Sequence, residues 1–206
     1  MGLIMTQRKL VIFSGGDRVG KSTLISNIQK LLGEENCDVF HHGAPPYHTS
    51  NVFDFYRINR DKWLEGGKEW CLFDRSWACS YCLEDWRRHT HGQLDEIANV
   101  EIEFLRMADQ FSVIHVAVEK PWKWSAPKHI EELDQMHRDA PAWVIRDEYV
   151  ARQKEHKHYY ERLYDFYENV TAFPSMVHSQ SFAKTASEAE ARYVVERVKS
   201  TLHSFG

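Results

Sequence analysis

The stretch KLVIFSGGDRVGKST, residues 9–23, joins a short apolar run to a glycine-rich turn and then to an amphipathic segment. The apolar run, residues 9–14, stops at two glycines as a buried strand does, and a helical pattern follows from Lys21 to about Leu32. The turn GGDRVGKS, residues 15–22, fits the pattern G-x-x-x-x-G-K-[ST] in the strand–turn–helix context that this pattern requires. It therefore predicts a phosphate-binding loop, the alternative being a chance glycine-rich turn.

The residue types of this loop suit a triphosphate. Gly15 and Gly20 allow the backbone N–H groups to turn inward around the phosphates, and the start of the helix adds a partial positive charge. Lys21 can reach the β and γ phosphates, and the Ser22 hydroxyl can bind Mg²⁺. We expect ATP as the co-substrate together with Mg²⁺. The residues expected to hold them are Gly15, Gly16, Asp17, Arg18, Val19, Gly20, Lys21, Ser22 and Thr23.

Length and composition narrow the class of protein. The chain has 206 residues, of which 43% are hydrophobic and 27% charged, so it can bury a core without disulfides and is not mostly disordered. A net charge of −4 gives no global basic field to attract nucleic acid or a membrane. No apolar run approaches the ~18–20 residues of a membrane span, so we expect no membrane partner. Four cysteines do not make a disulfide scaffold. We expect a cytoplasmic protein, in the host cytoplasm if the source is a virus.

Strand and helix patterns alternate along the chain. Besides the first strand, we expect strands at residues 37–42, 70–74, 111–118 and near 176–177. Helices are expected at about 51–66, 76–88, after Gly92, at 146–168 and at about 187–202. This alternation predicts an α/β fold, a three-layer P-loop NTPase sandwich with a five-stranded parallel sheet. We expect one P-loop domain, residues 1–206, in which the polar segment 120–145 is a lid-like insertion.

A second motif, Phe73-Asp74-Arg75-Ser76, ends the third expected strand. Ligands of open parallel sheets bind beyond the carboxyl ends of the strands, so Asp74 is expected near the phosphate-binding loop. There it can hold Mg²⁺ together with Ser22 or accept a proton from a hydroxyl, while Arg75 can clamp an acceptor phosphate. The alternative is a helix cap made by Asp74 or Ser76, with Arg75 in solvent.

These two motifs resemble those of thymidylate kinases, many of which carry Asp-Arg before x-Gly-Lys-Ser-Thr. Asp74-Arg75 also resembles their Asp-Arg-Tyr element and the Glu-Arg-Ser element of the related deoxynucleoside kinases. The resemblance implies that Arg18 stabilises the transferring phosphoryl group, that Asp17 contacts the acceptor and that Arg75 contacts the acceptor phosphate. The catalytic residues expected from residue chemistry and resemblance together are Lys21, Arg18, Asp17, Asp74 and Arg75.

The chain departs from that family after the second strand, where it has HHGAPP at residues 41–46 and no carboxylate. Cys79 also stands where the family has serine. Some bacteriophages encode related enzymes that phosphorylate 5-hydroxymethyluracil in DNA, and the unusual strand exit and tryptophan-rich lid fit a non-standard acceptor. We expect transfer of the ATP γ-phosphate to a pyrimidine-nucleotide-type acceptor, dTMP-like or a modified thymidine. The alternatives are the kinase acting on phage DNA, with DNA as partner, and a P-loop ATPase or nucleotide switch; a homodimer is a further expectation.

The acceptor is expected near the helix that follows the second strand. Phe53 could stack on a pyrimidine, Arg57 or Arg60 could hold a phosphate, and His42 ends the strand beside the expected site. The alternative for this helix is one packed aromatic face and one solvated basic face. In the lid, one of the cations Lys123, Lys128, Arg138 and Arg146 is expected to reach the phosphates.

The pair Cys79 and Cys82 has C-x-x-C spacing and is followed by His89 and His91, a set that could bind Zn²⁺. Both cysteines fall inside an expected helix, and the chain has no second C-x-x-C. Buried helical cysteines are the favoured interpretation.

Overall fold

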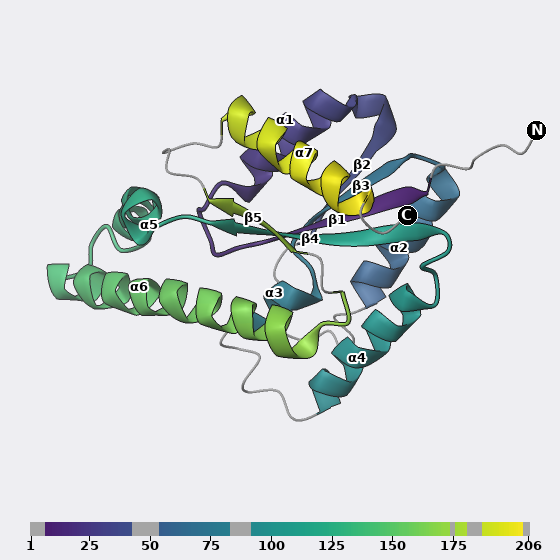
Figure 1. Ribbon diagram of the computed structural model, residues 1–206. Helices are drawn as coiled ribbons and strands as arrows, with labels where there is room; N and C mark the ends of the chain where they lie inside the picture. The colour runs from purple at the N-terminus through teal and green to yellow at the C-terminus, as the bar shows by residue number, and fades with distance from the viewer. Residues whose placement is uncertain (1–6, 43–53, 83–91, 174–175, 181–186, 204–206) are drawn as a thin grey trace, which may run out of the picture.

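The sheet is the central layer of the molecule. The computed structural model describes residues 7–42, 54–82, 92–173, 176–180 and 187–203 (Figure 1). Within them, the strands form one five-stranded sheet, all parallel, in the order β2-β3-β1-β4-β5. The strands are β1 (Arg8–Ser14), β2 (Cys37–His41), β3 (Trp70–Asp74), β4 (Phe111–Glu119) and β5 (Met176–Gln180). The predicted parallel five-stranded α/β fold is confirmed.

Helices cover both faces of this sheet. Figure 1 shows α1 and α7 on one face and α3, α4 and α6 on the other, with α5 lying beyond the strand ends. The longer helices are α1 (Lys21–Leu32), α2 (Asp54–Gly66), α4 (Gly92–Leu105), α5 (Trp122–Met136), α6 (Ala142–Asp165) and α7 (Glu188–His203). The shorter ones are η1 (Glu34–Asn36), α3 (Trp77–Cys82) and the π-helical turn η3 (Phe166–Val170). None of the described helices is both long and apolar enough to span a membrane.

Because both faces are covered, the central strands are apolar on both sides. Leu10, Ile12 and Phe13 of β1 are all fully buried. The core also holds Ile97, Val100 and Phe104 of α4, together with the buried residues of α6 and η3. These residues hold the helices on the sheet.

The segment 120–145 is more regular than the insertion expected from its sequence. It forms α5 and the start of α6, which begins at Ala142 and not at Arg146. Pro121 and Pro141 occupy the N-cap positions of these two helices, where the backbone is not yet helical and proline costs little. Two of the three prolines in this segment therefore mark helix starts, and Pro127 lies inside α5.

The strand order places the candidate site. β1 lies between β3 and β4, with Phe13 opposite Asp74 and Ser14 opposite Ala117, so the carboxyl ends of the three strands meet at one edge. The chain leaves β1 through α1 on one face and leaves β3 through α3 and α4 on the other (Figure 1). Such a reversal opens a crevice between neighbouring strand ends.

Candidate functional site

The turn after β1 is a tight loop that requires glycine at two positions. A Cβ on Gly15 would lie 2.4 Å from the Val118 carbonyl oxygen of β4, closer than real Cβ atoms come to other atoms. Gly20, the N-cap of α1, has a φ of 92°, in the left-handed region that favours glycine. These two glycines let the loop lie against β4 and enter α1, as the motif predicts.

The Lys21 side chain lies along this loop. Its ammonium group donates hydrogen bonds to the carbonyl oxygens of Gly15 at 2.8 Å and of Gly16 at 2.7 Å. Burial lowers the pKa of Lys21 below its ordinary value, and the Arg75 guanidinium lowers it further. The ammonium is thus held at the mouth of the loop, next to a second cation.

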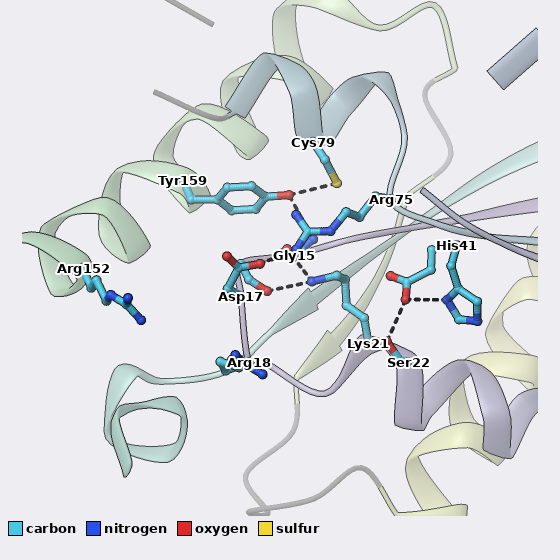
Figure 2. A network of polar contacts seen from close by, with 12 residues as sticks. Gly15, Asp17, Arg18, Lys21, Ser22, His41, Arg75, Cys79, Arg152 and Tyr159 are labelled. Carbon is cyan, nitrogen blue, oxygen red and sulfur yellow. Dashed lines mark hydrogen bonds and ion pairs between the residues drawn. The ribbon is translucent and has the colours of Figure 1, made fainter. Parts of the chain in front are cut away.

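Ser22 and Asp74 meet as expected for a magnesium site. The Ser22 hydroxyl donates to Asp74 Oδ2 at 2.7 Å, and His41 Nδ1 lies 3.0 Å from the same oxygen (Figure 2). Asp74 Oδ1 is buried and has no hydrogen-bond partner among the described residues. A hydroxyl and a carboxylate with an unpartnered oxygen are the hard donors that Mg²⁺ prefers, so these residues fit that ion.

Asp17 and Arg75 form an ion pair across the crevice between the loop and the end of β3. Although burial raises the pKa of Asp17, Arg75 outweighs that effect and holds the pKa below its ordinary value. Arg75 and Arg18 are the non-glycine residues with positive φ among those described, at 78° and 62°. Such conformations are costly and cluster at functional sites.

Two consecutive tyrosines of α6 hold the beginning of the loop. The Gly15 N–H donates to the Tyr159 hydroxyl at 3.1 Å, and the Gly16 N–H donates to the Tyr160 hydroxyl at 3.3 Å. Tyr159 in turn donates to Cys79 Sγ at 3.1 Å, and Tyr160 donates to the Val118 carbonyl at 2.8 Å. Nothing local in the sequence shows where these two hydroxyls will point.

A cavity of about 710 Å³ lies over the loop, between two groups of residues. We call the first group the floor: the loop residues lining the cavity, with Asp74 and Arg75. We call the second the wall: Lys128, His129 and Glu132 of α5, with Arg152, Glu155, His156 and Tyr159 of α6. Five basic side chains and four carboxylates line this one cavity. The cations are Arg18, Lys21, Arg75, Lys128 and Arg152.

Glu132 joins floor to wall. Its Oε1 lies 2.9 Å from Arg18 Nη2, and its Oε2 lies 2.9 Å from Arg152 Nη1. His129 Nδ1 is 3.3 Å from the same Arg152 nitrogen. Figure 2 shows Arg18 and Arg152 together on the side of the site away from Ser22 and His41.

The predicted donor residues lie together at this cavity. Of the loop residues predicted from the motif, all but Gly15 and Val19 line it, and Asp74 and Arg75 do so too. Val19 is fully buried and packs beneath the loop, while Gly15 contributes its backbone.

Of the predicted lid cations, Lys128 lines the cavity. Lys123 lies over the Trp124 ring at 5.4 Å, Arg138 borders a different hollow, and Arg146 is exposed beside Asp147.

Three of the four predicted acceptor residues lie elsewhere in the fold. Arg57 pairs with Asp54 and Glu103, and Arg60 pairs with Asp61 and lies over the Phe104 ring at 4.9 Å. His42 is buried with its ring 4.7 Å from those of Tyr56 and Phe73, and burial lowers its pKa to about 4. Phe53 lies outside the described residues, and the other three do not line the cavity. Their role toward an acceptor stays a prediction.

Several residues at the site could not be singled out from the sequence. Arg152, His156 and Tyr159 share one face of α6 at i, i+4, i+7 spacing, a signal that exists in the sequence but does not distinguish a cavity from solvent. Lys120 is buried beside the loop, with its Nζ 3.1 Å from where a Gly20 Cβ would lie; burial lowers its pKa.

The C-x-x-C pair belongs to the core. Cys79 and Cys82 are both buried in α3, as the favoured interpretation expected, and His89 and His91 lie outside the described residues. In the part of the chain that the structure describes, no three His, Cys, Asp or Glu side chains are grouped as a metal site.

Comparison with known proteins finds similar solved structures. No family model matches the chain, and a search of curated proteins gives no significant match. Among solved structures, polyphosphate kinase 2 from Arthrobacter aurescens TC1 matches with a TM-score of 0.65 at 16% identity, covering 93% of this chain and 66% of that one. A putative polyphosphate kinase 2 from Pseudomonas aeruginosa PA01 matches with a TM-score of 0.63 at 13% identity, covering 100% and 45%.

A deoxyadenosine kinase from M. mycoides with bound dATP also matches, with a TM-score of 0.46 at 18% identity over 93% of this chain and 99% of that one. The chain spans about two thirds of the length of the Arthrobacter polyphosphate kinase 2 chain and just under half of the Pseudomonas chain. The likeness to the two polyphosphate kinase 2 structures supports the α/β fold with its five-stranded parallel sheet. The narrower thymidylate-kinase resemblance stays a prediction.

Proposed function

We propose that the protein is a Mg²⁺-dependent phosphotransferase that moves the γ-phosphate of ATP to a pyrimidine-nucleotide-type acceptor. One observation carries this proposal: Lys21, Ser22 and Asp74 converge with two arginines, Arg18 and Arg75, on one cavity at the end of β1 and β3. Phosphoryl transfer needs positioning and positive charge more than covalent chemistry, and this cavity offers both.

On the donor side, the loop amides and the start of α1 would hold the phosphates, and Lys21 would exchange its carbonyl contacts for phosphate oxygens. Ser22 and Asp74 would hold Mg²⁺, which when bound neutralises charge on the phosphates. Arg18 would stabilise the group in transfer, in keeping with its strained backbone and its position at the cavity.

On the acceptor side, Arg75 would orient the acceptor, and Asp17 holds Arg75 in place. The low pKa of Asp17 makes its carboxylate a weak base, which favours an acceptor that is already an anion over one that is a hydroxyl. A phosphate acceptor needs no base, so we favour a nucleoside monophosphate such as dTMP. A hydroxyl of 5-hydroxymethyluracil in DNA is the alternative, for which Asp17 or Asp74 is the candidate base.

The likeness in fold to polyphosphate kinase 2 structures favours a second candidate, in which inorganic polyphosphate replaces ATP as donor or the nucleotide as acceptor. Five cations around one cavity suit a phosphate chain as well as a nucleotide. A GTP-binding switch is less favoured, because the sequence has no guanine-recognition motif of the N-K-x-D type. A P-loop ATPase is the alternative that the acceptor dependence of phosphate release decides.

The test is transfer of label from [γ-³²P]ATP in the presence of Mg²⁺ to a panel of acceptors: dTMP, thymidine, other nucleotides, hydroxymethyluracil-containing DNA and polyphosphate. We expect label in a nucleoside diphosphate, and none with the Lys21→Met variant. Label in DNA, with binding that weakens steeply as salt rises, would favour the DNA kinase. Rapid phosphate release that no acceptor alters would overturn the proposal in favour of an ATPase.

A further inference from the structure

The two sequence motifs do not explain why the Glu132 carboxylate lies at this cavity. It is an acidic side chain from α5 placed in a cavity whose proposed ligands are anions. Each of its oxygens pairs with a different arginine at 2.9 Å, Arg18 from the loop and Arg152 from α6. A carboxylate between two guanidinium groups has the charge and the oxygen geometry of part of a phosphoryl group.

We propose that Glu132 occupies a phosphoryl-binding position formed by Arg18 and Arg152, and that a phosphorylated ligand must displace it to bind. This inference rests on the proposed function, because it takes the cavity as a phosphate site. Glu132 would act on catalysis through the two arginines, and is therefore a positioning residue.

The surroundings of the two arginines favour exchange over a permanent structural bridge. Arg18 and Glu132 are partly exposed, with side-chain exposures of 47% and 34%, so water can reach the pair and replace its contacts. Exposed ion pairs contribute little to folding, and a phosphate with more charge and more oxygens than a carboxylate can compete for the same guanidinium groups.

The positions of both arginines are fixed by features other than Glu132. Arg18 has a backbone φ of 62°, a conformation that a side chain of this size rarely adopts, and this conformation accompanies its position at the cavity. Arg152 also has contacts besides Glu132, because its Nη1 lies 3.3 Å from His129 Nδ1 and its Nη2 lies 3.7 Å from Met136 Sδ. Loss of the carboxylate would therefore leave Arg152 partly oriented.

A carboxylate in this position would affect both the affinity of the cavity for phosphates and its selectivity among anions. It lowers affinity for phosphates, because every ligand has to break two ion pairs first. It also reduces the electrostatic repulsion between Arg18 and Arg152 when no phosphate is bound. The cavity would thus select among anions, because only an anion that contacts both arginines compensates for the loss of the two Glu132 ion pairs.

The experiment is a calorimetric titration of wild type and of the Glu132→Gln variant with ATP, ADP and dTMP, each in the presence of Mg²⁺. Glutamine keeps the shape and removes the charge, so we expect it to bind the displacing ligand roughly three- to tenfold more tightly. A gain for ATP but not ADP assigns the position to the terminal phosphoryl group of the donor, and an equal gain for both assigns it to an inner phosphate. A gain for dTMP alone assigns it to the acceptor phosphate.

Two further variants separate this mechanism from a general change of charge. Glu155→Gln removes the same charge from the same cavity, and we expect it to raise the affinity for the ligand less than Glu132→Gln does. An equal rise in affinity would overturn the inference. Glu132→Asp keeps the charge but is too short to reach both arginines, so it should give part of the gain. In an Arg152→Gln background, replacement of Glu132 should gain less than in wild type, and an undiminished gain would contradict the bridge.

Unchanged or weaker binding by both Glu132 variants, with melting temperatures near that of wild type, would overturn the inference. The titration measures binding and not transfer. A protein that transferred phosphate to no acceptor would therefore refute the proposed function without altering the affinities that decide this inference.

Discussion

The floor and the wall of the cavity are built in different ways. The floor is held by backbone: Arg75 N–H donates to the Phe13 carbonyl at 3.0 Å, and the strand register puts Asp74 beside the loop. The wall is held by side chains of α5 and α6, chiefly the ion pairs of Glu132 and the hydroxyl of Tyr159. A floor fixed by backbone geometry tolerates few substitutions, whereas a wall of partly exposed charges can be altered with smaller effects.

The largest effect is expected at the floor, from Lys21→Met. The variant loses the cation that we place against the transferring phosphate, so kcat/KM should fall by about 10³-fold. Lys30→Met is the matched control, because Lys30 is exposed near the end of the same helix. Label transfer from ATP measures both variants, and a loss under tenfold for Lys21→Met would break the contrast between floor and wall.

Arg18 lies where floor and wall meet, and its loss should have the next largest effect. We expect Arg18→Ala to lower kcat by about 10²-fold and to change KM much less, because the guanidinium is proposed to act mainly in the transition state. Steady-state kinetics at varied ATP concentration separate the two parameters. A large rise in KM with unaltered kcat would assign Arg18 to ground-state binding.

Gly15 tests the backbone packing of the floor. In Gly15→Ala the new Cβ meets the Val118 carbonyl, so the loop or β4 must shift, at a cost of about 1–3 kcal/mol in the free energy of unfolding. Gly16→Ala is the matched control, since its Cβ would lie 3.3 Å from His156 Nδ1 and can be accommodated by a side chain. Urea unfolding compares the two, and equal destabilisation would show that the close approach at Gly15 is not the cause.

The smallest effect is expected at the wall, from Tyr159→Phe. The Gly15 N–H then loses its acceptor, and we expect a loss of about 1 kcal/mol in unfolding free energy, with a fall in ATP affinity of about fivefold. Tyr164→Phe is a control on the same helix, since Tyr164 donates to Glu119 away from the cavity. An equal loss of ATP affinity in both variants would mean that Tyr159 has no special role at the loop.

Much of the floor could be predicted because its signals are local. Residues 15–22 form a continuous motif, and Asp74 directly follows a run of apolar strand residues. The helix starts within residues 120–145 could not be predicted, because prolines at helix starts and prolines in loops look alike in the sequence. The predicted acceptor arginines illustrate the same limit: Arg57 and Arg60 have suitable chemistry, but Glu103 from a distant helix pairs with both.

The sequence by itself determined the alternation of strands and helices, the glycine-rich loop after the first strand and the presence of Asp74 and Arg75 at a strand end. Each of these depends on neighbours a few residues away, through side-chain periodicity and glycine conformation. Only the tertiary structure decided that Glu132 bridges Arg18 and Arg152 and that Tyr159 accepts the Gly15 N–H. Those contacts depend on how α5 and α6 pack above the strand ends, and side-chain polarity alone does not reveal which distant partner a charge or hydroxyl will find.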